Sequence, residues 1–128
     1  MEIINYKNKK IILDGSHNID GADKLNEFLR TKRIKPIVLF GMLNNKKASL
    51  FLKKIKKRVS KVLAIKIPDE KNSFKTKQIN EICHFHSIKC EQVKNINEAL
   101  KYFRSNQEKI YLITGSLYLI GKIRRRLL

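Results

Sequence analysis

The sequence predicts a three-layer α/β sandwich with a Rossmann-like, mainly parallel sheet. Short apolar runs, which suit buried strands, alternate along the chain with longer segments whose apolar residues recur at helical spacing. The apolar runs are uninterrupted, which indicates strands that are covered on both faces. We expect about six strands, of which one edge strand is antiparallel, and about five helices. No linker or repeat divides the chain, so a single domain over residues 1–128 is predicted.

The first half of the chain supplies three of the expected strands and two of the helices. Residues 2–8 alternate weakly and predict a short edge strand, and residues 10–13 predict the first buried strand. A helix follows over about 18–33, and the apolar run 36–40 is typical of a parallel strand. A second helix comes next. Inward positions at helical spacing are Ala22, Leu25, Phe28 and Leu29 in the first helix, and Ala48, Phe51, Leu52, Ile55 and Val59 in the second.

The second half repeats this alternation. Strands are predicted at 61–67, 90–93 and 110–114. Asn95 is in position to cap the helix before the last strand, and a terminal helix is expected from Ser116 to the end of the chain. The inward positions are Ile79, Ile82 and Cys83 in the third helix, and Ile96, Ala99, Leu100 and Phe103 in the fourth.

Composition limits the class of protein. Hydrophobic residues make up 42% of the chain, which is enough for a packed core. No apolar run approaches the ~20 residues of a membrane span, and the first residues do not resemble a signal peptide. The two cysteines are too few for a disulfide framework. We therefore expect a cytoplasmic protein with no membrane partner.

The formal net charge of +18 raises the alternative of a stand-alone module that binds nucleic acid or another polyanion. The basic residues are mostly lysines and are spread over every segment, and only 53–58 and 124–126 form clusters. No ribonucleoprotein motif, zinc-finger spacing or basic zipper is present. We therefore attribute the charge to compositional drift and expect no nucleic-acid partner.

Candidate binding residues follow the first buried strand. Asp14 ends that strand, and His17 and Asn18 lie on the turn before the first helix, where open α/β sheets place their ligands. A carboxylate there can accept hydrogen bonds from two ribose hydroxyls, and a neutral imidazole can stack on a base or bind a phosphate. The alternative is that Asp14 and Asn18 only cap the turn and the helix.

Ser116 is a second candidate, at the start of the terminal helix. Its hydroxyl and the unpaired backbone amides there favour a carboxylate, because the helix dipole converges at that point. An ordinary serine N-cap would leave the same pattern.

Three further patterns are rejected. Residues 115–123 approach the phosphate-binding pattern G-x4-G-K-[ST], but the spacing is one residue too long and the final hydroxyl is missing. The cysteines and histidines of 83–90 match no zinc spacing, so no metal ligand is expected. A Ser-His-Asp triad within 14–17 is excluded because neighbours on one tight turn cannot align for catalysis.

Three segments together resemble a known family. Residues 14–22 are similar to its D-G-A-H-N-P-x-G-A segment, 41–47 to G-M-L-x-D-K-D, and 114–121 to T-G-S-L-Y-L-x-G. Ser16 replaces the usual alanine. The other departures are Ile19 for proline and Asn45 and Lys47 for the two acids, whereas Lys46 matches. Over its whole length the chain resembles the C-terminal domain of the bifunctional dihydrofolate synthases/folylpolyglutamate synthases, in the Mur ligase group.

The resemblance implies a role for each candidate. The family are ATP-dependent amide ligases that add L-glutamate to dihydropteroate or folates. By resemblance, Asp14 would hold the ATP ribose, and His17 would lie against the nucleotide, act in catalysis and help to bind glutamate. Ser116 would contribute to the glutamate site, with Asn18 and Lys46 in supporting loops.

The resemblance also implies what must come from elsewhere. The family carries its phosphate-binding loop and magnesium ligands on a preceding central domain, and a Gly-Arg pair stands just ahead of the position of Met1. We therefore expect the chain to be a fragment that is inactive alone. Its expected partner is the N-terminal and central ATPase part of the same ligase, its cofactor ATP, and Mg²⁺ only through that central domain.

Overall fold

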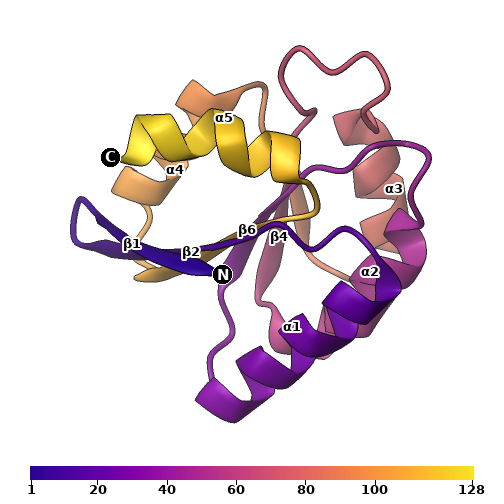
Figure 1. Cartoon of the computed structure of the whole chain (residues 1–128), viewed down its shortest axis with the longest axis horizontal. Coiled ribbons are helices and arrows are strands. Elements are labelled where there is room, and N and C mark those ends of the chain that lie inside the picture. Colours follow the sequence, from indigo (N-terminus) through magenta and orange to yellow (C-terminus); the bar gives the residue numbers. More distant parts are fainter.

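The computed structural model describes residues 1–128 as one six-stranded sheet with helices on both faces (Figure 1). The strands are β1 (Glu2–Tyr6), β2 (Lys9–Asp14), β3 (Ile37–Phe40), β4 (Lys61–Ala64), β5 (Cys90–Gln92) and β6 (Ile110–Thr114). The helices are α1 (Ile19–Lys32), α2 (Ala48–Ile55), α3 (Thr76–Phe85), α4 (Ile96–Ser105) and α5 (Leu117–Leu127), with a 3-10 turn, η1 (Lys56–Arg58), after α2. The predicted three-layer fold is confirmed.

The sheet has the order β1-β2-β6-β3-β4-β5. Only β1 is antiparallel to its neighbour, and the other adjacent strands run parallel. The last strand of the chain, β6, therefore lies between β2 and β3. In the register, Asp14 and Phe40 are both partners of Thr114, so β2, β3 and β6 end at a common edge. The candidate residues that follow these strands therefore lie at one edge of the sheet.

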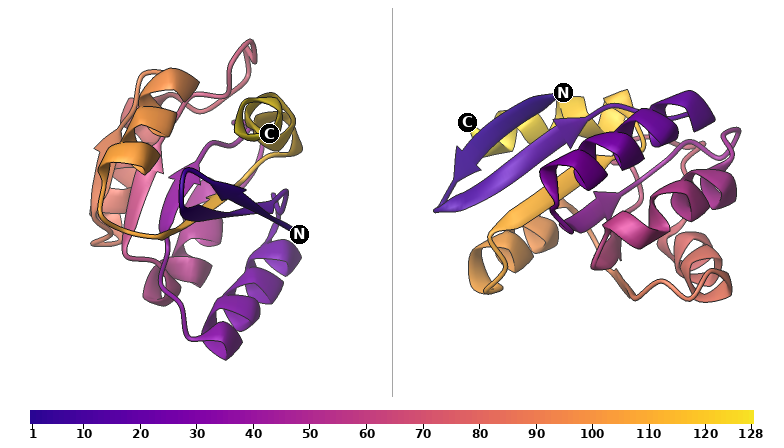
Figure 2. Two further views of the ribbon diagram at one scale, coloured as in Figure 1. Left: turned by 90° about the vertical axis from the view of Figure 1, so that its left-hand side faces the viewer. Right: turned by 90° about the horizontal axis from the view of Figure 1, so that it is seen from below.

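Two apolar cores cover the two faces of the sheet. One packs α4 and α5 against one face, and the other packs α1, α2 and α3 against the opposite face. The left view of Figure 2 shows the β1–β2 hairpin between α5 above it and α1 below it. Both faces of β3 are buried, as its uninterrupted apolar sequence predicts.

Some boundaries and burial predictions were wrong. Val59 lies beyond α2 and η1, and it fills the core from an extended backbone rather than from a helix. The predicted strand 61–67 stops at Ala64, after which Ile65 and Ile67 stay buried without continuing the ladder. Phe28 and Ile82 are only partly buried at the edge of the core. The spacing of apolar residues indicates which residues are buried, but a buried residue can lie in a loop as well as in a helix or a strand.

Capping residues fix where the helices beside the candidate site begin and end. Asn18 caps α1, since its side chain accepts a hydrogen bond from the Gly21 amide, and Arg33 ends that helix in a left-handed conformation. Ser116 caps α5 in the same way. Asn95 caps α4 by accepting from the Glu98 amide, as predicted. None of the helices combines the length and the apolar character that a transmembrane segment requires.

Candidate functional site

Three loops meet at the common edge where β2, β3 and β6 end. The Gly115 amide donates a hydrogen bond of 3.1 Å to the carbonyl oxygen of Ser16, which ties the loop after β6 to the loop after β2. The Gly41 amide approaches the carbonyl oxygen of Thr114 at 3.5 Å. The candidate side chains therefore stand on a backbone framework that connects three strands.

Glycine allows these loops to approach so closely. Gly115 has a φ of +109°, a conformation that other residues rarely adopt. A Cβ atom at this position would lie 2.3 Å from the carbonyl oxygen of Gly41. The backbone of one loop thus passes directly over the backbone of the next.

The Asp14 carboxylate turns back toward its own loop. Its Oδ1 atom accepts a hydrogen bond of 2.9 Å from the Ser16 hydroxyl and another of 3.2 Å from the Ser16 amide. No hydrogen bond involves Oδ2 within the chain. Part of the capping role considered for Asp14 is thus present, and one carboxylate oxygen remains available.

His17 is held by its own turn. Its Nδ1 atom lies 3.1 Å from the carbonyl oxygen of Gly15, and because a carbonyl only accepts hydrogen bonds, Nδ1 carries the proton. In the neutral ring the Nε2 atom is then an acceptor. His17 therefore presents a proton acceptor in a fixed orientation.

Two connected hollows surround His17. The first, of about 430 Å³, is lined by His17, Leu43, Asn45, Lys46, Gly115, Ser116, Leu117 and Tyr118. The second, of about 380 Å³, is lined by His17, Asn18, Ile19, Asp20, Asn45, Lys46 and Lys47. Because His17, Asn45 and Lys46 line both, the two hollows form one cleft, which we call the His17 cleft.

The His17 cleft favours an anion. No acidic side chain lines its first hollow, and only Asp20 stands against Lys46 and Lys47 in the second. Ser116 lies at the start of α5 and is 3% exposed. Its oxygen accepts hydrogen bonds from the amides of Tyr118 (3.1 Å) and Leu119 (3.4 Å), which leaves its hydroxyl proton free to donate.

The fold thus brings four predicted residues to the His17 cleft: His17, Asn18, Lys46 and Ser116. Asp14 lies at the same edge of the sheet but lines neither hollow. Sequence reasoning missed Asn45, which lines both, and Tyr118, a residue 56% exposed at the wall of the first hollow. Asn45 lies within the 41–47 motif and Tyr118 within the 114–121 motif, so the motifs themselves could have identified both residues.

The pattern of cysteines and histidines at 83–90 does not form a metal site. No group of three or more His, Cys, Asp or Glu side chains gathers anywhere in the structure. Cys83 is fully buried, and its hydrogen bond with Cys90 together with burial raises the pKa of its thiol.

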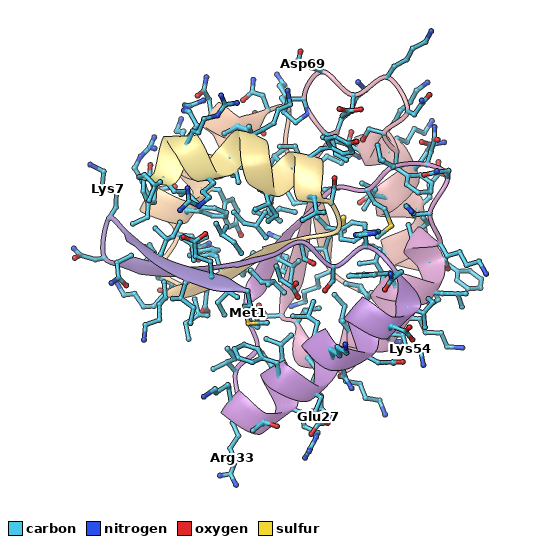
Figure 3. All side chains as sticks on the ribbon, in the orientation of Figure 1. Met1, Lys7, Glu27, Arg33, Lys54 and Asp69 are labelled. Carbon is cyan, nitrogen blue, oxygen red and sulfur yellow. The ribbon has the colours of Figure 1, made fainter.

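Basic side chains point outward over the whole fold, as Figure 3 shows for Lys7, Arg33 and Lys54. The most basic hollow, of about 670 Å³, lies away from the His17 cleft. Its lining residues are Asn26, Leu50, Lys53, Lys54, Lys56, Lys57, Arg58 and His86. Lys54 pairs with Asp23 at 3.2 Å, and Arg58 donates to Asn26 at 3.2 Å. The remaining lysines of this hollow are exposed.

We expect this basic hollow to bind no nucleic acid with sub-micromolar affinity at physiological salt. Lysines that bind phosphates release the counterions condensed on the nucleic acid, and the free energy gained by this release falls steeply as the salt concentration rises. Fluorescence anisotropy with duplex DNA and with RNA, at low and at physiological salt, measures this. Sub-micromolar binding that persists at physiological salt and is lost on replacing Lys53, Lys56 and Lys57 by alanine would support the polyanion-binding alternative.

A family model for the C-terminal domain of dihydrofolate synthetase matches residues 1–126. The chain belongs to this family. No curated protein matches the chain.

The fold is that of several folate ligases. Folylpolyglutamate synthase from Thermotoga maritima matches with a TM-score of 0.85 and 26% identity, over 98% of this chain and 29% of that chain. A bifunctional folylpolyglutamate synthase/dihydrofolate synthase from Yersinia pestis, complexed with AMPPNP and Mn ion, has a TM-score of 0.82 and 19% identity, over 98% of this chain and 30% of that chain. The E. coli protein in complex with DHPP and ADP has a TM-score of 0.76 and 14% identity, over 98% of this chain and 30% of that chain. The chain thus spans less than a third of each relative.

Proposed function

We propose that this chain is the C-terminal domain of an ATP-dependent ligase that joins L-glutamate to dihydropteroate or to folates in the cytoplasm. The observation that carries the proposal is the His17 cleft, a cationic hollow with a proton acceptor at its centre, at the strand edge of a fold that belongs to this family. The folate ligases of Yersinia pestis and E. coli were solved with nucleotides, which supports ATP as the second ligand.

The incoming glutamate fits the cleft by its charges. The Ser116 hydroxyl and the start of α5 suit one carboxylate, because a free donor and the positive end of the helix dipole coincide there. Lys46 supplies a cation for the other. His17 then stands next to the amine, where its Nε2 atom can accept the proton that the amine must lose before it attacks a carbonyl.

In this proposal Asp14 and His17 bind the nucleotide. The free Oδ2 atom of Asp14 can accept a hydrogen bond from a ribose hydroxyl. ATP converts the folate-side carboxylate into an acyl phosphate, which the glutamate amine attacks to form the amide with release of phosphate. With no cluster of three metal-binding side chains in this chain, the magnesium ion belongs to the central domain in this proposal.

Water exclusion gives the domain a further part in the reaction. An acyl phosphate hydrolyses unless the site is closed, and a domain that carries the second substrate can close it. Leu117 is 65% exposed and Tyr118 56% exposed at the wall of the His17 cleft. These apolar surfaces suit burial against the central domain when the site closes.

Fusion to the missing part tests the proposal. We expect the 128-residue chain alone to show neither ATP hydrolysis nor ligation, and we expect activity when it is fused behind the N-terminal and central domains of a folate ligase through a Gly-Arg junction. The assay is amide formation from dihydropteroate or folate, ATP and glutamate. The same N-terminal part without this chain is the control. Ligation by the isolated chain, or a correctly folded fusion without activity, would contradict the proposal.

A further inference from the structure

The Asp14 carboxylate is held on one side only. Both hydrogen bonds from Ser16, through its hydroxyl at 2.9 Å and its amide at 3.2 Å, reach the same oxygen, Oδ1. The amide bond depends on the turn and is open to any residue at position 16. The hydroxyl bond requires Ser16, and the family segment quoted above has an alanine there.

The position of Ser16 is fixed from three directions. Its carbonyl oxygen accepts hydrogen bonds from the Gly115 amide at 3.1 Å and from the Thr114 hydroxyl at 3.5 Å. On its other side, a Cβ atom at Gly21 would lie 2.7 Å from the Ser16 Cβ and 2.8 Å from its hydroxyl oxygen. The first turn of α1 thus packs against this side chain and favours the orientation in which the hydroxyl donates to Asp14.

We propose that Ser16 is a positioning residue that restricts Asp14 to one ligand oxygen, so that the site recognises one ribose hydroxyl and accepts a nucleoside triphosphate that lacks the other. This inference rests on the proposed nucleotide role of Asp14. A carboxylate that grips both hydroxyls of a ribose uses both of its oxygens. Here two donors already occupy Oδ1, and only Oδ2 has its lone pairs free.

The test compares three nucleotides on the 128-residue chain. NMR titrations with ATP, 2′-deoxy-ATP and 3′-deoxy-ATP at millimolar concentrations follow the amide signals of residues 14–18. For the wild type we expect one deoxy nucleotide to bind like ATP and the other to bind about tenfold more weakly, the loss of one charge-assisted hydrogen bond. Ser16→Ala removes the hydroxyl bond but keeps the amide bond, so it frees one lone pair of Oδ1, and for this variant we expect both deoxy nucleotides to bind more weakly than ATP.

Two further variants separate the possible failures. Ser105→Ala removes an exposed hydroxyl on α4 and should keep the wild-type pattern. Asp14→Asn should weaken ATP and reduce the difference among the three nucleotides. If Asp14→Asn weakens ATP but Ser16→Ala keeps the wild-type pattern, the role of Ser16 is overturned and the proposed function stands. If the wild type does not bind ATP, or Asp14→Asn binds it unchanged, the nucleotide role of Asp14 fails and this inference fails with it.

Discussion

Replacing Gly115 by alanine should destabilise the fold by about 3 kcal/mol or more, the range of severe backbone and packing defects. The residue has a φ of +109°, and a Cβ atom would lie 2.3 Å from the Gly41 carbonyl oxygen and 3.0 Å from the Phe40 ring. The first contact is with backbone, so relief requires separating the loops after β3 and β6. Urea unfolding followed by circular dichroism measures the change in the free energy of unfolding.

Gly121→Ala is the matched control. Gly121 lies within α5, and apart from its chain neighbours and the backbone of its own helix no atom lies within 4 Å of the Cβ that it would gain. Alanine favours a helix over glycine by up to about 1 kcal/mol, so this variant should be as stable as the wild type or more stable. Equal stability of the two variants would show that the close approach of the loops carries no energetic weight.

In the fused ligase, Asp14→Ala should lower kcat/KM by about tenfold to a hundredfold, which corresponds to about 1–3 kcal/mol for a lost hydrogen bond to a charged group. The substitution removes the Oδ2 atom that is proposed to hold the ribose. It also removes the acceptor for both Ser16 bonds, so the turn that carries His17 loses an anchor.

Asp69→Ala provides a control for the loss of a carboxylate. Asp69 is on an exposed loop and makes a salt bridge of 3.3 Å with Lys122, of the surface kind that contributes little. Kinetics of amide formation for the wild type and both variants, measured with ATP varied, separate their effects. An Asp14→Ala enzyme as active as Asp69→Ala would show that Asp14 acts only as a cap of its turn.

The sequence predicted the strand ends around the candidate site better than the arrangement of its side chains. The sequence predicted a mainly parallel sheet with ligands bound beyond the ends of its strands, and the loops after β2, β3 and β6 do meet at one edge. The two Ser16 bonds to a single oxygen of Asp14 follow from the path of the turn in space, which spacing along the chain does not encode. That Asn45 lines both hollows of the His17 cleft likewise depends on how two loops pack against each other.

The same limit applies to the fold. The apolar residues of 61–67 are buried as predicted, but only the residues from Lys61 to Ala64 pair with β3. Val59 is buried for the same reason without belonging to a helix. Apolar pattern identifies the core, whereas hydrogen-bond pairing depends on neighbours that are distant in sequence.

The position of β6 between β2 and β3 determines the order in which this protein can be assembled during synthesis. Until residues 110–114 have left the ribosome, the β1–β2 hairpin has no partner in the rest of the sheet, and β2 and β3 present unpaired edges toward each other. Translation is slow compared with local folding, so an incomplete sheet persists while α4 is being made. The His17 cleft, which needs the loop after β6, is therefore among the last parts of the molecule to form.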